Sequence, residues 1–208
     1  MWAIIPINNF NESFSRLSNI LKKEQRKEMT QILATQVLDA LTPIASVEKI
    51  IVLSNEIEWL SSFGNKKITV LPEPDTEQFS KKIDYTTQWI QNQGVTAMLY
   101  LSIDLPYIQQ EDIENLISQH ISGLSIVEAK KDNGTNALIL DLPTKMEFQF
   151  GPNSFSKHLA EARSKNINTT IVNIECLSLD LDDWNDLHLF KKNSVENKFS
   201  QFINRNNF

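Results

Sequence analysis

Short apolar segments rich in Ile, Val and Leu alternate with longer amphipathic segments along most of this chain. The short segments have the length and composition of β-strands, and the longer ones carry apolar residues at helical spacing. The expected strands are residues 2–7, 50–53, 68–71, 97–101, 125–128, 137–140 and 170–174. The expected helices are residues 24–41, 56–63, 77–93 and 110–120, with a further helix after Pro152. Strands and helices that take turns predict an α/β fold of three layers, in which helices cover both faces of a mostly parallel sheet.

The chain has the size of one domain. Its 208 residues, of which 41% are hydrophobic, are enough to bury a full core. The sequence has no internal repeat and no linker rich in Gly, Pro or Ser. It therefore predicts a single domain over residues 1–190, followed by a polar, Asn-rich tail over residues 191–208. The tail is interpreted either as a docked helix or as a frayed end, and in both cases we expect it to lie at the periphery of the domain.

Charge and composition disfavour several classes of protein. The net charge of −6 weighs against nonspecific binding to nucleic acid, which needs dense basic patches. No apolar run approaches the roughly 18–20 residues of a membrane span, and the opening MWAIIPINNF does not resemble a signal peptide. We therefore expect a cytoplasmic protein whose partners are neither nucleic acids nor membranes. Cys176 is the single cysteine, which excludes an internal disulfide and a cysteine-based zinc cluster.

Two common nucleotide-binding motifs are missing from the sequence. There is no P-loop pattern GxxxxGK followed by Ser or Thr, and no GxGxxG, so a P-loop ATPase and a dinucleotide-binding Rossmann enzyme are both disfavoured. The histidines carry no clear signal. His120, His158 and His188 fall in three different predicted helices, and each is interpreted as a surface or helix-packing residue.

Glycine is rare in this chain, yet two of its five glycines, Gly134 and Gly151, lie close together in the sequence. Because glycine can turn through positive φ, such loops can bring backbone N–H groups close to a bound phosphate. A helical pattern begins after Gly151, with Asn153 or Ser154 as the expected N-cap, so the positive end of the helix dipole would serve the same anion site. The alternative is that both glycines only close turns.

Three aspartates stand where a metal site is common. Asp104 follows a predicted central strand, and Pro106 then forces the chain away from the sheet. Asp180 and Asp182 have the i, i+2 spacing that aims both side chains to one face of an extended segment. Three such carboxylates can hold Mg²⁺ or Mn²⁺, which prefer oxygen ligands. The alternative is that Asp104 caps a helix and the acidic run is a solvated loop.

Four segments resemble, in order and spacing, the guanylyltransferase family of deazaflavin coenzyme biosynthesis. They are DLP at residues 104–106, GTNAL at 134–138, FGPNSFSKHLAEA at 150–162 and DLD at 180–182. The resemblance spans roughly residues 2–190 and includes SRL at residues 15–17 and the segment KEQRKEM. The pairing of the second and third segments is specific, whereas DLP or DLD alone would mean little.

The resemblance implies a Rossmann-like nucleotidyltransferase fold, similar to that of molybdenum-cofactor guanylyltransferase. It also implies a reaction in which the phosphate of a small three-carbon acid attacks the α-phosphorus of GTP and diphosphate leaves. The family includes enzymes that accept 2-phospho-L-lactate, phosphoenolpyruvate or 3-phosphoglycerate. GTP and a phosphorylated acid are therefore the implied partners.

Roles for single residues follow from the same resemblance. The family's metal-binding aspartates match Asp104, Asp180 and Asp182, of which Asp104 is expected to be catalytic. Its contacts to the acceptor phosphate match Thr135, Gly151 and Ser154, and Asn136 lies in the same GTN segment. Arg16 and Lys157 are the expected cations for the charge that develops on the diphosphate or on the acceptor carboxylate.

The chain departs from the family pattern on the side of the nucleotide. Asn8 and Phe14 stand where family members commonly carry lysines, and Asp84 replaces an asparagine at an expected nucleotide contact. Two alternatives stay open beside the guanylyltransferase: a noncatalytic binding protein on the same scaffold, and a nucleotidyltransferase with another acceptor. The sequence does not decide the oligomeric state, and a homodimer is compatible with it.

Overall fold

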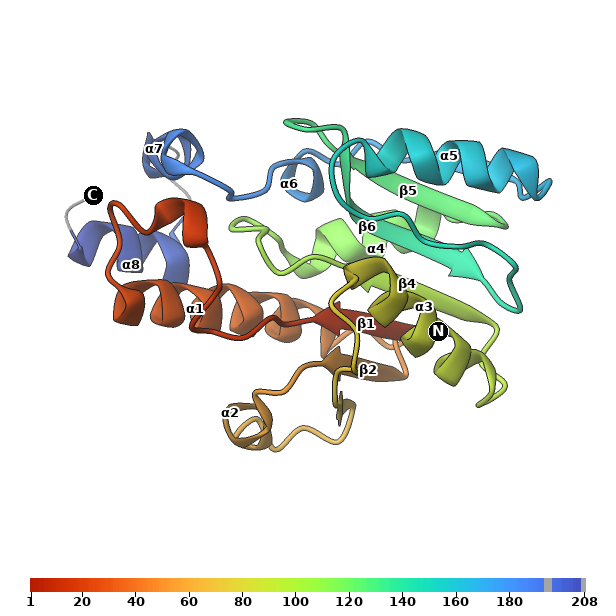
Figure 1. Cartoon of the computed structure of the whole chain (residues 1–208), viewed down its shortest axis with the longest axis horizontal. Helices are drawn as coiled ribbons and strands as arrows, with labels where there is room; N and C mark the ends of the chain where they lie inside the picture. The colour runs from red at the N-terminus through yellow and green to blue at the C-terminus, as the bar shows by residue number, and fades with distance from the viewer. Residues whose placement is uncertain (193–195, 207–208) are drawn as a thin grey trace.

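Seven strands form one sheet within residues 1–192 and 196–206, which the computed structural model describes (Figure 1). The strands are β1 (Trp2–Pro6), β2 (Lys49–Leu53), β3 (Ile68–Leu71), β4 (Ala97–Leu101), β5 (Leu124–Ala129), β6 (Gly134–Asp141) and β7 (Thr169–Ile171). Their order across the sheet is β3-β2-β1-β4-β6-β5-β7. All the predicted strands are confirmed, with small shifts at their ends.

The helices include all those expected from the sequence and several more. They are the 3-10 turn η1 (Ser15–Leu17), α1 (Lys23–Leu41), α2 (Ile57–Ser61), α3 (Phe79–Gln91), α4 (Gln110–Gln119), α5 (Ser154–Ser164), α6 (Glu175–Ser178), α7 (Trp184–Lys192) and α8 (Lys198–Arg205). The apolar pattern predicts neither η1 nor α6, which are short, and it gives no range for α7, the helix that contains His188. In the described ranges no helix is both long and apolar enough to cross a membrane.

The sheet is mostly parallel, with one strand reversed. β6 runs antiparallel to both of its neighbours, β4 and β5, while the other strand pairs are parallel. Because of this reversal, β6 begins where β4 ends: Ala137 pairs with Leu101, and the backbone N–H of Ser102 donates to the carbonyl of Asn136 at 2.9 Å. The GTN segment is thereby placed beside the carboxyl end of the central strand.

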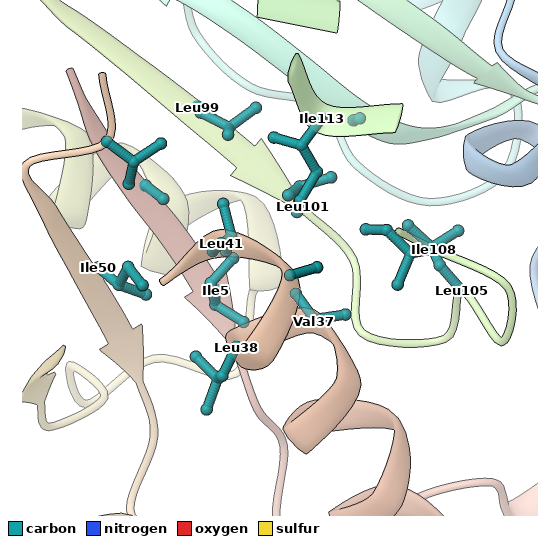
Figure 2. Close-up of a cluster of buried hydrophobic side chains, with 14 of the residues drawn as sticks. Ile5, Val37, Leu38, Leu41, Ile50, Leu99, Leu101, Leu105, Ile108 and Ile113 are labelled. Atoms are coloured by element: carbon teal, nitrogen blue, oxygen red, sulfur yellow. The ribbon is translucent and has the colours of Figure 1, made fainter. Parts of the chain in front are cut away.

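Helices cover both faces of the sheet, which gives the expected three layers. Alternate residues of a strand point to opposite faces, so Ile5 packs with α1 and α4 on one side while Ile4 packs with α3 and α5 on the other. Figure 2 shows Val37 and Leu41 of α1 beside Ile5 and other strand residues in the first of these layers. Each such fully buried aliphatic side chain stabilises the fold by about 1.5–3 kcal/mol.

A third apolar cluster lies where α8 packs against the first half of α1 and against α7 (Figure 1). Phe190 of α7 and Phe199 and Phe202 of α8 are buried there. The expected tail of residues 191–208 thus contains a docked helix, although residues 193–195 and 207–208 lie outside the described ranges. The side chain of Asn197, before α8, donates to the carbonyl of Pro106 at 2.8 Å. The C-terminal segment therefore supports the loop that follows β4.

Candidate active site

The structure brings the three predicted aspartates together. One carboxylate oxygen from each of Asp104, Asp180 and Asp182 lies within 4.8 Å of the others. Asp104 follows β4, and the other two follow α6 in an extended segment. The backbone N–H of Leu181 donates to the carbonyl of Asp104 at 2.8 Å and so holds the two segments side by side. The sharp turn at Pro106 and the i, i+2 spacing together produce this convergence.

Without a bound cation, the negatively charged form of this carboxylate cluster is unfavourable. Burial raises the pKa of Asp104 to about 7, and the charge of Asp180 adds to the rise, while a hydrogen bond from the Ser102 hydroxyl opposes it. Burial also raises the pKa of Asp180, against a hydrogen bond of 3.3 Å from the amide of Asn136. The pKa of Asp104 is raised first because burial penalises the charged carboxylate, and further because Asp180 and Asp182 carry like charges nearby. Charges in such an arrangement favour binding of a cation.

Two adjoining cavities meet at these carboxylates. The first is lined by the loop after β1, by η1 and by Ser102, and the second by the start of β6 and by the loop before α5. Asp104, Asp182 and Arg16 line both cavities, whereas Asp180 lines only the second. The acidic cluster therefore stands at the boundary between two spaces, each of which can take a ligand.

The two glycines of the second cavity differ in what they do. Gly151 has a φ of +109° with open space where a Cβ would stand, so its backbone requires glycine. Gly134 does not have positive φ: its N–H donates to Oδ1 of Asp132 at 2.8 Å, and a Cβ would come within 2.6 Å of the same oxygen. The expectation of a free N–H at Gly134 for phosphate is therefore wrong, because Asp132 already accepts from it.

The N-terminus of α5 also differs in part from expectation. Asn153 is the N-cap, but its side chain does not cap the helix, and its backbone is left-handed with a φ of 60°. The N–H groups of Ser154 and Phe155 donate to the carbonyls of Gly151 and Asn133, at 3.0 Å each. Two of the first N–H groups of the helix are thus bonded within the protein. The hydroxyls of this region become the main candidates for anion binding.

A buried polar cluster carries those hydroxyls. The hydroxyl of Ser154 donates to Oγ1 of Thr135 at 3.1 Å, and Nδ1 of His158 lies 3.0 Å from the same oxygen. All three side chains are buried, and Thr135 and Ser154 also line the second cavity. Sequence reasoning missed the contribution of His158. Its i, i+4 spacing from Ser154, which places both on one face of α5, is the signal that could have found it.

Comparison with known proteins decides the family. The family described as guanylyl transferase, CofC like, matches residues 1–203. This chain belongs to that family. The CofC-like chain is 27% identical over 198 residues to 2-phospho-L-lactate guanylyltransferase of Methanobrevibacter ruminantium, covering 90% of this chain and 83% of that protein. It is 30% identical over 188 residues to phosphoenolpyruvate guanylyltransferase of Chloroflexus aurantiacus, covering 86% and 89%.

Solved structures show the fold of this family member. A protein from Desulfovibrio desulfuricans, described as a nucleotide-diphospho-sugar transferase, superposes with a TM-score of 0.78 over 99% of this chain and 94% of its own, at 12% identity. At that identity the likeness speaks for the fold alone. The expected nucleotidyltransferase fold is confirmed.

Of the two expected cations, one lies in the cleft of the CofC-like chain. Nη1 of Arg16 pairs with Oδ2 of Asp182 at 2.9 Å, and Arg16 lines both cavities. Lys157 is exposed on α5, its Nζ donates to the carbonyl of Pro152 at 2.9 Å, and it lines neither cavity. In this structure the side chain of Lys157 turns back toward the start of its own helix and does not border the cleft, so its contact with substrate stays a prediction.

Of the three residues that depart from the family pattern, two border the cleft and one does not. Asn8 and Phe14 line the first cavity, as expected for positions that face the nucleotide. Asp84 lies away from the cleft on α3: its Oδ1 accepts from the N–H of Phe148 at 3.1 Å, and its Oδ2 pairs with Lys81 at 3.2 Å. Asp84 therefore secures the segment before Gly151 and lines neither cavity of the cleft.

Proposed function

We propose that this CofC-like chain transfers GMP from GTP to a small phosphorylated three-carbon acid, with release of diphosphate, in deazaflavin coenzyme biosynthesis. The candidate acids are 2-phospho-L-lactate, phosphoenolpyruvate and 3-phosphoglycerate, the first two of which name relatives of this chain. The observation that carries the proposal is the position of the acidic cluster at the boundary of two adjoining cavities. GTP takes the first cavity, and the acid takes the second.

The donor set suits Mg²⁺ or Mn²⁺. Three carboxylate oxygens within 4.8 Å of one another offer hard ligands to a small divalent cation. The raised pKa of Asp104 reflects the cost of this cluster without a cation, which binding would remove. Asp104, Asp180 and Asp182 are the proposed ligands. A bound divalent cation would supply charge neutralisation between the two anionic substrates.

The reaction needs no nucleophile from the protein. An oxygen of the acceptor phosphate attacks the α-phosphorus of GTP, the bond from that phosphorus to the bridging oxygen breaks, and diphosphate leaves with the electron pair. The acceptor phosphate is ionised near neutral pH, so no general base is required either. The chain's task is to hold two anions in line.

Arg16 is the proposed catalytic cation. It lines both cavities and reaches Asp182, so its guanidinium stands close to where the diphosphate separates from GMP. A guanidinium can bind two phosphate oxygens at once and stabilises negative charge that grows during the reaction. Its present partner is a carboxylate at the edge of the cleft, which a cation bound to the cluster would neutralise.

The acceptor site is formed by β6 and the loop before α5. The hydroxyls of Thr135 and Ser154 and the backbone of Gly151 surround the second cavity. Asn136 holds Asp180 in place and so joins the acceptor site to the acidic cluster. A three-carbon acid that carries one phosphate matches a small polar site next to a cation, in which the Thr135 hydroxyl can donate.

Diphosphate release tests the proposal and separates it from its alternatives. The protein is incubated with Mg²⁺, one of the four nucleoside triphosphates and one acceptor at a time, which is one of the three acids, a molybdopterin or a sugar phosphate. We expect release with GTP and at least one acid, and none when the acid is left out. Release only with a molybdopterin or sugar phosphate would support a nucleotidyltransferase with another acceptor. No release with any combination would leave a noncatalytic binding protein and refute the enzyme.

A further inference from the structure

One buried group close to the acceptor site has no role in the reaction as described so far. His158 of α5 is completely buried, in contact with β6 and with the loop that leads to Gly151. It lines neither cavity of the cleft, so it does not touch a ligand there. Its two ring nitrogens instead contact two different segments of the acceptor site.

The hydrogen bonds of His158 fix its tautomer. The backbone N–H of Gln149 points at Nε2 at 2.9 Å. A backbone N–H can only donate, so Nε2 must carry the lone pair, and the ring proton of a neutral imidazole is then on Nδ1. Nδ1 lies 3.0 Å from Oγ1 of Thr135 and donates to it.

Thr135 is thereby left with one free hydrogen-bonding group. Its Oγ1 accepts from Nδ1 of His158 and from the hydroxyl of Ser154 at 3.1 Å. A hydroxyl oxygen has two lone pairs, so both are used. The remaining group is the hydroxyl proton, and the side chain of Thr135 borders the second cavity. A proton directed there suits an anion.

The ring of His158 has little freedom to change this arrangement. Phe148 and Phe150 meet it edge to face, with ring centroids at 5.9 Å and 4.9 Å. Burial, with a smaller effect of the nearby Lys157, lowers the pKa of His158 to about 4. The ring is therefore neutral near pH 7, and the tautomer is held by packing as well as by hydrogen bonds.

We propose that His158 is a positioning residue for the acceptor phosphate: the N–H of Gln149 holds its ring in one tautomer, and its Nδ1–H leaves the hydroxyl proton of Thr135 directed into the second cavity. This inference rests on the proposed function of the cleft, since the anion it serves is the phosphate of the acid. A donor that is oriented before the phosphate arrives loses no rotational freedom on binding, which strengthens binding of the acid.

Two substitutions divide the contacts of His158 between them. In His158→Asn the side-chain amide stands near the place of Nδ1 and can still donate to Thr135, but nothing accepts from Gln149. In His158→Gln the longer amide reaches the place of Nε2 and can accept from Gln149, but no donor faces Thr135. Each variant loses one buried hydrogen bond and therefore some stability, which thermal unfolding measures. A difference between the two variants in binding of the acid then reports the contact with Thr135 alone.

The test is the KM for the acid and the KM for GTP in both variants, with direct binding of phosphoenolpyruvate measured by calorimetry. We expect His158→Gln to raise the KM and the Kd for the acid about tenfold with little change for GTP. His158→Asn is expected to stay within about threefold of the wild type in both. Equal changes in the two variants, or no change in His158→Gln, would overturn the inference and leave a packing residue.

A third readout does not depend on activity. The ¹⁵N shifts of His158 in the unliganded wild-type protein report which ring nitrogen is protonated. A protonated Nδ1 with an unprotonated Nε2 supports the inference, and the opposite tautomer overturns it. If the wild type binds phosphoenolpyruvate but releases no diphosphate, the proposed enzyme fails while the binding comparison still tests His158. If the wild type does not bind the acid at all, the inference fails with it.

Discussion

The backbone N–H of Leu181 donates to the carbonyl oxygen of Asp104 at 2.8 Å. This one hydrogen bond joins the loop after β4 to the extended segment after α6, and Leu181 stands between the two aspartates of that segment. Leu181 is also completely buried in the cluster formed with α7 and α8. The acidic cluster is therefore held by the core of the molecule, so a cation bound there would be set in place by the fold.

Replacing Asp104 with Asn removes one proposed ligand without changing the shape of the side chain. We expect diphosphate release to fall by at least about 100-fold, because the cluster loses a charge where the cation binds. The metal-free fold should keep its stability, since Asn relieves the repulsion between carboxylates and can still accept from Ser102. Initial rates and thermal unfolding in chelator measure both effects. Activity near that of the wild type would show that Asp104 is not a ligand.

The acidic cluster predicts a pH dependence whose sign can be worked out. The pKa of Asp104 is about 7 in the metal-free fold, whereas an aspartate in an unfolded chain has its usual pKa of 3.8. Between these values the folded state keeps a proton that the unfolded state has lost, so the free energy of unfolding falls as pH rises from about 4 to about 7. Thermal unfolding of the wild type against Asp104→Asn, in chelator across this range, isolates the effect. A difference between them that stays constant with pH would contradict the assignment.

Substituting Arg16 with Gln tests the proposed catalytic cation. The Arg16 side chain is 68% exposed, so its pair with Asp182 should contribute less than about 1 kcal/mol to stability. We expect turnover to fall at least about tenfold while the melting temperature changes little. Arg205→Gln is the matched control, because Arg205 pairs with Glu28 at the junction of α8 and α1, away from the cleft. An equal loss of turnover in both variants would point to a general effect of charge.

Gly151→Ala tests the backbone of the acceptor loop. A φ of +109° is unfavourable for alanine although nothing within 4 Å of a Cβ would clash, so the variant carries about 1–3 kcal/mol of strain at the cavity wall. We expect a higher KM for the acid. Gly94→Ala is the control: it has a φ of +78°, open space and a place before β4, away from the carboxyl end where Asp104 lies. A raised KM in both variants would show that lost stability alone is responsible.

The sequence predicts the strands, the longer helices and the three aspartates because each depends on a local pattern. Apolar runs define β1 and β4, and the spacing of Asp180 and Asp182 in an extended segment places both on one face. The direction of β6 has no local signal, because alternation of side chains is the same in parallel and antiparallel strands. Only the pairing of β6 with β4 shows why the GTN segment lies beside Asp104.

Other features escape prediction because they depend on partners far away in the sequence. In the Asn-rich C-terminal segment, Phe199, Phe202 and Ile203 have helical spacing among many polar residues. They become buried only by packing against α1, which is distant in the sequence. Gly134 looks like a phosphate-binding glycine until the carboxylate of Asp132 is seen on its N–H. His158 looks like a helix-packing residue until its two nitrogens are followed to β6 and to Gln149.

The most direct measurement of the central claim is ³¹P NMR of one reaction that holds the protein, Mg²⁺, GTP and all three acids. The account predicts that GTP resonances decline while those of diphosphate and of a new diphosphate diester, GMP joined to one acid, grow together. The same mixture with Asp104→Asn should stay unchanged over the same time. A spectrum of intact GTP with the wild type, or conversion only to GDP and phosphate, would contradict guanylyl transfer at this cluster.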